Sequence, residues 1–366
     1  MDLLVTYPDL PTREVLYPDD LAARLESLGD VDWNESEEQF TPAELRDRLE
    51  SVDVCVTGWG CPTLSDAVLE GVDDLQLELV AHVGGSIATV ASPALYDRGV
   101  AVCSANRTMA PFVAEGILAY TLTALREIPT FDADLTAGEW PEATGAASEI
   151  PQTETLFGAS IGFVGLGDVG RELLALLEPF DPIVRVYDPY LSADELDDVD
   201  CAELTDLESA LETADVVSIH AAKTPETLHL LDADRLASLP VGCLLVNAAR
   251  GAIVDEDALI AELRSGRISA ALDVFKTEPL PEESPLRDLE NALLGPHVAG
   301  APVRHRLTET IIDEIERFAT GEPLQHRHSR ERYERMTRDR LEADDAADEK
   351  ASDAADAGDE PETGAR

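Results

Sequence analysis

Positive charge is scarce in this chain of 366 residues. Lys and Arg together number 27 against 75 Asp and Glu, the formal net charge is −48, and the only lysines are Lys223, Lys276 and Lys350. Binding to nucleic acid depends on basic contacts to phosphates, so this balance argues against nucleic acid or an anionic membrane as a partner. An acidic surface poor in lysine favours a protein that stays hydrated in concentrated salt, a halophilic one.

Cysteine is also sparse, and its spacing excludes two classes of protein. The five cysteines form no Cys-x-x-Cys pair, and Cys55, Cys103 and Cys243 lie in apolar, strand-like runs. We therefore expect core thiols in a reducing compartment, neither a disulfide framework nor a bound metal. The acidic start of the chain resembles no signal peptide, and no uninterrupted apolar run has the length of a membrane span, so a cytoplasmic protein is predicted.

What the chain does have is a repeated alternation of strand-like and helix-like segments. In its first part, strands are predicted at residues 3–6, 52–56, 77–82 and 100–104, and helices at 42–51 and 65–70. This part lacks a glycine fingerprint and predicts a separate small α/β domain.

The second part predicts a long helix at residues 111–126, then a six-stranded, doubly wound sheet. Its strands are expected at 161–164, 183–187, 216–220, 243–247, 270–273 and 292–294, and a closing helix at 303–320. Beyond residue 330 the composition becomes charged and poor in apolar residues, so residues 331–366 are expected to form a largely disordered acidic tail.

The most informative motif is a strand, a glycine-rich turn, a helix and a second strand at residues 159–188. Gly165 permits the tight turn, Gly167 lets the backbone approach a pyrophosphate, and Gly170 lets the helix pack closely on the strand. Asp188 ends the second strand, where a carboxylate accepts hydrogen bonds from a ribose and repels a 2′-phosphate. The motif predicts a dinucleotide site that prefers NAD to NADP.

Three side chains suited to acid–base chemistry follow later strands of the same sheet. Arg250 follows the strand that ends at Asn247, Glu278 lies five residues after Asp273, and His297 follows the last strand. Alone, each has a plainer explanation: a surface arginine, a solvated carboxylate and a structural histidine. Their shared place beyond the carboxyl ends of strands, where ligands of such sheets bind, favours an active site.

With the fingerprint, these segments closely resemble the D-isomer-specific 2-hydroxyacid dehydrogenases over residues 50–325. The resemblance implies two Rossmann-like or flavodoxin-like doubly wound domains, with the cofactor domain inserted into the substrate domain. The implied limits are 1–108 plus 300–330 for the substrate domain and 109–299 for the NAD-binding domain, in a homodimer.

The same resemblance implies the reaction and the role of each site residue. A small 2-keto acid and its (R)-2-hydroxy acid would be interconverted by hydride transfer, with Arg250 binding the substrate, His297 as general acid/base and Glu278 favouring protonated His297. Substrate would also meet the backbone of Gly84, Gly85 and Ser86. The implied cofactor-binding residues are Gly165, Leu166, Gly167, Asp168, Val169, Asp188, Ala248 and Asp273.

Several positions depart from the pattern of that family. Ser86 replaces a common glycine, Met109–Ala110 a usual Asn-Thr pair, Ala222–Lys223 a frequent Pro-Leu, and Lys276 a frequent acid or proline. They alter the surroundings of the site and leave Arg250, Glu278 and His297 in place. A non-catalytic, NAD-sensing interaction protein of corepressor type remains the alternative.

Overall fold

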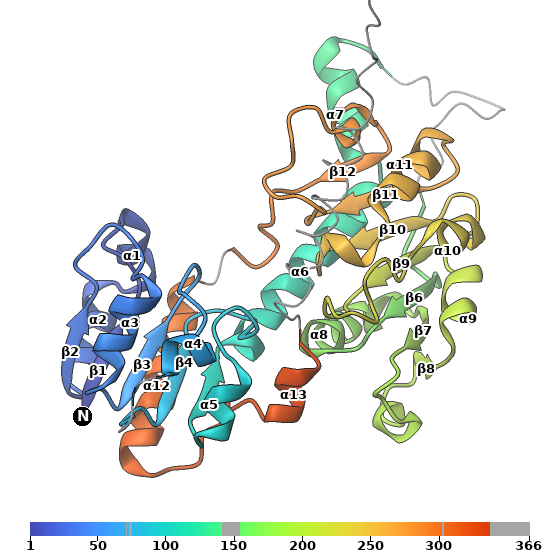
Figure 1. Cartoon of the computed structure of the whole chain (residues 1–366). Coiled ribbons are helices and arrows are strands. Elements are labelled where there is room, and N and C mark those ends of the chain that lie inside the picture. The colour runs from blue at the N-terminus through green and yellow to red at the C-terminus, as the bar shows by residue number, and fades with distance from the viewer. Residues whose placement is uncertain (71, 73–74, 141–153, 302–303, 337–366) are drawn as a thin grey trace, which may run out of the picture.

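The strands of the computed structural model form two parallel sheets in two lobes (Figure 1). The structure describes residues 1–70, 72, 75–140, 154–301 and 304–336. Both sheets have helices packed against them, so the predicted α/β class with two doubly wound domains is confirmed. The exact domain limits stay a prediction.

The first sheet has the order β2-β1-β3-β4-β5, with every neighbouring pair parallel. Its strands are β1 (Asp2–Val5), β2 (Asp30–Trp33), β3 (Val54–Thr57), β4 (Leu79–His82) and β5 (Ala101–Ser104). Sequence reasoning missed β2, an edge strand in which two aspartates alternate with Val31 and Trp33. Aspartate is depleted in strands, and this one pairs only with β1.

Short helices connect these strands and bury leucines against the sheet. They are α1 (Pro11–Leu16), α2 (Asp19–Glu26), α3 (Pro42–Leu49), α4 (Asp66–Leu69) and α5 (Pro93–Asp97). The predicted helices at 42–51 and 65–70 correspond to α3 and α4. Thr41 caps α3 by accepting from the Glu44 N–H, while the Glu44 side chain accepts from the Thr41 N–H.

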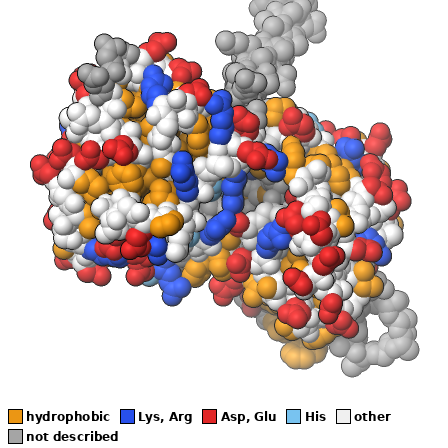
Figure 2. Space-filling view, turned by 90° about the horizontal axis from the view of Figure 1, so that it is seen from below, with side chains coloured by type: hydrophobic (Ala, Val, Ile, Leu, Met, Phe, Trp, Pro, Cys, Tyr) orange, Lys and Arg blue, Asp and Glu red, His pale blue; other side chains and the backbone are white. Residues whose placement is uncertain are grey.

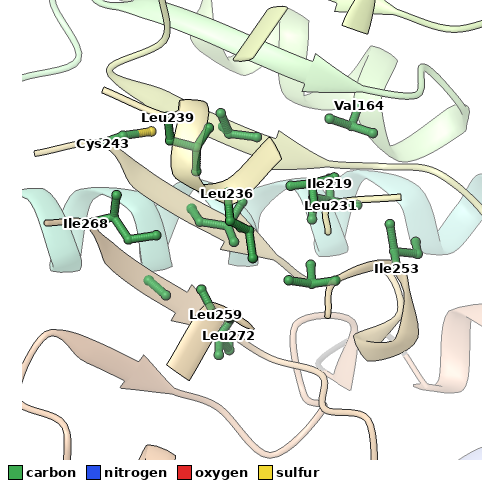
Figure 3. Close-up of a cluster of buried hydrophobic side chains, with 14 of the residues drawn as sticks. Val164, Ile219, Leu231, Leu236, Leu239, Cys243, Ile253, Leu259, Ile268 and Leu272 are labelled. Atoms are coloured by element: carbon green, nitrogen blue, oxygen red, sulfur yellow. The ribbon is translucent and has the colours of Figure 1, made fainter. Parts of the chain in front are cut away.

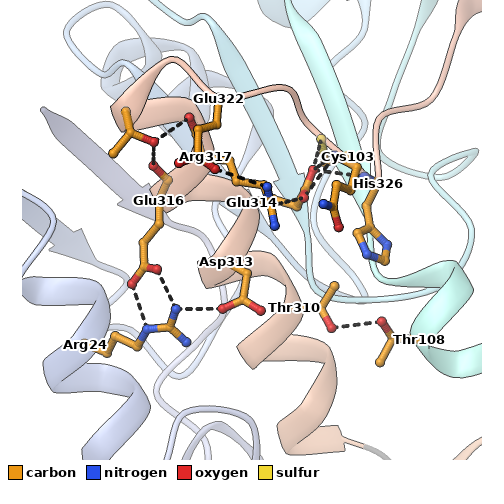
Figure 4. Close-up of polar contacts among 12 residues, drawn as sticks. Arg24, Cys103, Thr108, Thr310, Asp313, Glu314, Glu316, Arg317, Glu322 and His326 are labelled. Carbon is orange, nitrogen blue, oxygen red and sulfur yellow. Dashed lines mark hydrogen bonds and ion pairs between the residues drawn. The ribbon is translucent and has the colours of Figure 1, made fainter.

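The last long helix returns to this first sheet. α12 (Arg304–Thr320) packs against α1, α2 and β4, and buries Leu307, Ile311 and Ile315. Arg24 of α2 binds Asp313 and Glu316 on its outer side (Figure 4). Segments almost 300 residues apart thus share one core.

The second sheet has the order β12-β11-β10-β9-β6-β7-β8. Its strands are β6 (Ser160–Val164), β7 (Ile183–Tyr187), β8 (Ala202–Leu204), β9 (Val216–Ile219), β10 (Leu244–Asn247), β11 (Ser269–Leu272) and β12 (Ala292–Leu294). The prediction of six strands was wrong because it missed β8, a three-residue edge strand too short for a periodic pattern. Strand order reverses between β6 and β9, which is where such sheets bind ligands.

The helices associated with the second sheet are α6 (Asn106–Leu125), α7 (Ile128–Ala137), α8 (Asp168–Leu177), α9 (Leu207–Glu212), α10 (Ala233–Ser238) and α11 (Glu256–Arg264). Short 3₁₀ turns lie at Glu178–Phe180, Ala193–Leu196, Gly251–Ile253 and Pro285–Asp288. Figure 3 shows the buried cluster formed on one face by residues such as Ile219, Leu236 and Leu272. Burial of this aliphatic surface holds the loops at the strand ends in place.

α6 links the two lobes and differs from its prediction. It begins at Asn106, five residues before the expected start, and Pro111 lies inside it. Its length and composition alone would let it cross a membrane, and in the structure it packs against α8, β10 and β11. The predicted limit between residues 108 and 109 falls within this helix.

The predicted disordered tail does not begin at residue 331. Arg330–Glu334 form a helix, α13, capped by Ser329, whose side chain accepts from the Arg332 N–H (3.1 Å). Tyr333 is buried and donates through its hydroxyl to Ala91 O (3.2 Å). Tyr333 thus anchors a charged segment that the sequence alone predicts to be disordered. The rest of the predicted tail, residues 337–366, lies outside the described residues.

Candidate active site

The glycine loop between β6 and α8 has the geometry that its sequence predicts. Gly165 has φ +88°, and a Cβ there would lie 2.8 Å from the Ala221 nitrogen. A Cβ on Gly167 would meet no atom within 4 Å, so the backbone there is open to a ligand. A Cβ on Gly170 would come within 3.3 Å of His220 Cγ, which explains the close helix packing.

Asp188 fixes this loop as well as marking the end of β7. Its Oδ2 accepts from the Leu166 N–H and its Oδ1 from the Tyr190 N–H, both at 2.9 Å. A cavity of about 390 Å³ begins here, lined by the glycine loop, Asp188, Tyr190 and the loop Thr224–Thr227. These residues fit a dinucleotide, because an open glycine backbone and a ribose-binding carboxylate line one cavity.

His220 forms a neutral wall of the same cavity. Its ring packs on Phe163 with centroids 4.6 Å apart, and neither ring nitrogen has a hydrogen-bond partner in the described part of the chain. Burial lowers the pKa of His220 to about 3. These observations fit a packing role for His220.

The other predicted cofactor residues are distributed around this loop. Leu166 is buried, Val169 of α8 packs against a buried hydrophobic cluster, and Ala248 follows β10. Asp168 is the first residue of α8, and its carboxylate accepts from Asn106 Nδ2 (2.6 Å) and also binds Arg332. Cofactor contacts of these residues stay predictions.

The structure brings Glu278 and His297 together. His297 Nδ1 lies 2.7 Å from Glu278 Oε2, while Glu278 Oε1 accepts from the Phe275 N–H (3.0 Å). His297 has φ +55°, a left-handed conformation rare for a residue other than glycine and often found at functional sites. The His297 side chain is 52% exposed, which leaves Nε2 accessible.

Asp273 holds the loop that carries His297. It is almost fully buried, and its Oδ1 accepts from the Tyr120 hydroxyl and the Val298 N–H, both at 2.9 Å. Its Oδ2 accepts from the Ala299 N–H (2.9 Å), and the His297 N–H donates to the Asp273 carbonyl (2.8 Å). The position of the imidazole therefore depends on this carboxylate.

Arg250 lies close to the same pair. A Cβ on Gly251 would overlap the backbone of Phe275, so the loop carrying Arg250 presses against the loop carrying Glu278. Burial lowers the pKa of Arg250, and the charge of Glu278 opposes that shift. Arg250 donates to the Ala249 carbonyl (2.6 Å), and no ion pair of its guanidinium is recorded in the described ranges, so it can receive a carboxylate.

The predicted substrate loop, Gly84 to Ser86, follows β4 in the other lobe. The Gly85 carbonyl accepts from Ser104 Oγ (2.8 Å), and the N–H groups of Gly85 and Ser86 show no acceptor among the described residues. A Cβ on Gly85 would lie 3.1 Å from Met109 Cε, and one on Gly300 would lie 3.3 Å from Met109 Cγ. Met109 thus lies between this loop and the chain that follows His297.

Sequence reasoning missed the contribution of the last described residues. His328 lies beside arginines in a polar stretch that carries no motif, yet it is buried and its Nε2 lies 2.7 Å from Ser104 Oγ. Burial lowers the pKa of His328 to about 4. Arg332 and Arg335 line the 390 Å³ cavity, although their charged segment carried no motif that could have indicated it.

Comparison with known proteins gives a consistent result. The family described as "D-isomer specific 2-hydroxyacid dehydrogenase, NAD binding domain" matches residues 118–299. D-3-phosphoglycerate dehydrogenase of Methanocaldococcus jannaschii is 30% identical over 301 residues, 81% of this chain and 55% of that protein. Glyoxylate reductase of Thermofilum pendens is 36% identical over 223 residues, 59% of this chain and 64% of that protein. The chain spans about half the length of the phosphoglycerate dehydrogenases it matches.

Solved structures agree in fold over nearly the whole chain. A phosphoglycerate oxidoreductase from Rhizobium etli has a TM-score of 0.74 and 26% identity, covering 90% of this chain and 98% of its own. A D-isomer specific 2-hydroxyacid dehydrogenase from Xanthobacter autotrophicus, in complex with NADPH and MES, has a TM-score of 0.68 and 27% identity, covering 91% and 99%.

Proposed function

Because the chain belongs to the D-isomer specific 2-hydroxyacid dehydrogenases and uses NAD, we propose that it interconverts a small 2-keto acid and the (R)-2-hydroxy acid. The observation that carries this proposal is the 2.7 Å contact between His297 Nδ1 and Glu278 Oε2 beside Arg250. An acid–base pair next to a cation is what reduction of a keto acid needs. A protein that only senses NAD does not require such a pair, so its presence argues against the NAD-sensing alternative.

In this proposal each of the three side chains has one task. Arg250 binds the substrate carboxylate and polarises the keto group. NADH, when bound, would supply the hydride to the keto carbon, and His297 Nε2 would deliver a proton to the substrate oxygen. Glu278 holds the ring through Nδ1 and stabilises the imidazolium before that transfer. The N–H groups of Gly85 and Ser86 would bind the other end of the carboxylate.

The finer substrate assignment is a small keto acid such as glyoxylate, hydroxypyruvate or pyruvate. Support comes from the sequence, in which no dense cluster of basic residues accompanies the substrate loop or the Arg250 segment. A phosphorylated substrate would need additional cations.

A panel of keto acids tests the proposal. NADH oxidation would be followed with glyoxylate, hydroxypyruvate, pyruvate and 3-phosphohydroxypyruvate, and the configuration of each product determined. We expect turnover with at least one unphosphorylated acid and an (R) product. If NADH binds but none of the four acids is reduced, the result favours the NAD-sensing alternative. If only the phosphorylated acid is reduced, the assignment of an unphosphorylated substrate is wrong.

The cellular setting proposed is a salt-rich cytoplasm. The net charge of −48, with three lysines, supports it, because acidic surfaces keep proteins hydrated and soluble when salt screens charge. The five cysteines are all free in the structure, and Cys55, Cys103 and Cys243 are buried, as core thiols of a reducing compartment would be.

A homodimer is proposed on the apolar surface of α7. No residue of this helix is buried, and Ile128 and Leu135 are 53% and 49% exposed, followed by Trp140 at 78%. Covering such a surface with a second copy would remove apolar area from water. Light scattering should give twice the 39.5 kDa of one chain, and Leu135→Glu should yield monomers. A wild-type mass of one chain would contradict the proposal.

A further inference from the structure

The last described helix reaches the cofactor cavity from the other lobe. Figure 1 shows α13 between α5 and α8, and Arg332 and Arg335 line the cavity together with the glycine loop and Asp188. Arg332 binds Asp168, the first residue of α8. The pyrophosphate of a dinucleotide faces this end of the helix.

Asp168 creates an electrostatic problem at that place. Its carboxylate lies at the N-terminus of α8, where two phosphate charges must also be accommodated, and like charges repel in a partly buried site. Arg332 and Asn106 are its partners. Arg332 cancels the charge of Asp168, and its fork of five N–H donors exceeds what one carboxylate oxygen accepts.

The chain holds Arg332 there through a series of fixed contacts. Buried Glu314 accepts from the Gln325 and His326 N–H groups (2.9 and 3.0 Å; Figure 4). The His328 N–H then donates to Val102 O (2.8 Å), and Tyr333 anchors α13 on Ala91. Arg332 thus extends from a segment tied to the first sheet, and a side chain fixed in advance loses less entropy on binding.

The distribution of charge supports a role for these arginines. In Figure 2 basic side chains gather near the junction of the two lobes, while acidic ones spread over the outer surface. Of the other cavity arginines, Arg171 binds Glu195 (3.3 Å), and Arg335 binds Glu331 and lies over the ring of Tyr190. Arg171 lies on α8 itself, whereas Arg332 comes from the other lobe and is the cavity arginine that binds Asp168, the first residue of α8.

We propose that Arg332 binds the pyrophosphate of NAD directly. The cofactor site would then be completed by the C-terminal segment, which packs on the lobe of the first sheet. The carboxylate of Asp168 keeps the guanidinium in position, and the phosphate accepts from the N–H groups that Asp168 does not occupy. Bound cofactor would then connect the two lobes through α13. The proposal rests on NAD binding and does not depend on which keto acid is reduced.

Direct binding measurements test it without any turnover. Dissociation constants of NADH, ADP-ribose and adenosine would be measured by calorimetry or displacement at one fixed salt concentration. We expect Arg332→Gln to weaken the binding of NADH and of ADP-ribose about tenfold or more, because a charge-assisted hydrogen bond is lost. The binding of adenosine, which has no phosphate, should stay unchanged. Arg332→Lys should be intermediate, since it keeps the charge and loses the fork.

Arg330→Gln is the matched control on the same helix. Arg330 pairs with Asp97 and Glu334 and does not line the cavity. Arg330→Gln should leave the dissociation constants of NADH, ADP-ribose and adenosine unchanged. Thermal unfolding would show that Arg330→Gln and Arg332→Gln are both folded.

A double-mutant cycle with Asp168→Asn separates direct contact from charge cancellation. If Arg332 binds phosphate, Arg332→Gln still weakens ADP-ribose in the Asp168→Asn background. If the effect of Arg332→Gln disappears in the Asp168→Asn background, the proposal is overturned. It is also overturned if the dissociation constants of NADH and ADP-ribose for Arg332→Gln stay within twofold of wild type, or if Arg332→Gln weakens the binding of adenosine equally. Wild-type protein that binds neither NADH nor ADP-ribose would overturn the cofactor assignment as well.

Discussion

At the scale of single residues, Asp188 has a second task that the sequence did not predict. It was expected to bind ribose, and in the structure it also accepts from the Leu166 and Tyr190 N–H groups. Its charge is what should exclude a 2′-phosphate, while its acceptor oxygens hold the glycine loop. The two tasks are separable by substitution.

Asp188→Asn should relax the preference for NAD. The amide keeps one acceptor oxygen for the loop and removes the negative charge, so we expect the ratio of kcat/KM for NADPH to that for NADH to rise about tenfold, the equivalent of about 1.4 kcal/mol. Asp194→Asn, in the 3₁₀ turn after Tyr190, is the control and should leave the ratio unchanged. An unaltered ratio in Asp188→Asn would mean that another group excludes the 2′-phosphate.

At the scale of elements, one buried carboxylate organises the end of the described chain. The Glu314 side chain is 1% exposed and accepts from the Gln325 and His326 N–H groups. Its Oε1 lies 3.6 Å from Arg317 Nε. Cys103 Sγ of β5 also contacts it, at 3.6 Å. These contacts direct the chain from α12 along β5 toward α13 and the cofactor cavity (Figure 4).

Glu314→Gln should lower the free energy of unfolding by about 1–3 kcal/mol, because a buried charged acceptor of several hydrogen bonds is replaced by a weaker one that brings an unmatched N–H₂ donor. Chemical denaturation would measure it. Glu316 lies on the exposed side of the same helix and pairs with Arg24. Glu316→Gln should therefore lower the free energy of unfolding by about 1 kcal/mol or less. Equal losses in the two variants would show that the buried network does not stabilise the segment.

How much the sequence could predict follows from the range of each interaction. The glycine loop and the strand-end positions of Arg250, Glu278 and His297 were predictable, because local motifs and sheet topology determine them. β2 and β8 were missed, since edge strands are short and carry weak patterns. The ordering of α13 depends on Tyr333 and Ala91, 242 residues apart, and the role of Arg332 on its contact with Asp168. No local pattern contains either contact.

At the scale of the whole molecule, charge and buried histidine determine the conditions under which the fold persists. Acidic residues exceed basic ones by 48, and most of the ion pairs in the described ranges lie at the surface. Beneath that surface, His82, His220 and His328 are held in neutral form by burial.

Salt should stabilise the protein strongly. Repulsion among carboxylates is screened over about 10 Å at 0.1 M ionic strength and about 3 Å at 1 M. We expect Tm to rise by about 10 °C or more between 0.1 and 2 M KCl, measured by calorimetry. A Tm that is flat or falls over this range would contradict a salt-adapted protein.

Acid should destabilise the fold through the three histidines. Burial lowers the pKa of His220 to about 3 and those of His82 and His328 to about 4, whereas each is about 6.5 in an unfolded chain. Between pH 6.5 and 4 the unfolded chain binds protons that the folded one does not, so stability is full above about pH 6.5 and falls as pH decreases.

Denaturation at pH 7 and 5, in constant salt, measures this loss. In His220→Gln the slope of the unfolding free energy against pH should be smaller by about one proton, or about 1.4 kcal/mol per pH unit near pH 5. Identical slopes in wild type and variant would show that His220 is not the source of the dependence.

The central claim is that His297 transfers the proton in keto-acid reduction. Its most direct test is kcat/KM of His297→Ala with the best keto acid of the panel, measured together with the dissociation constant of NADH. We predict a loss of about 10²–10⁴-fold in kcat/KM with NADH affinity unchanged. A variant that stays within a few-fold of wild type would contradict the account.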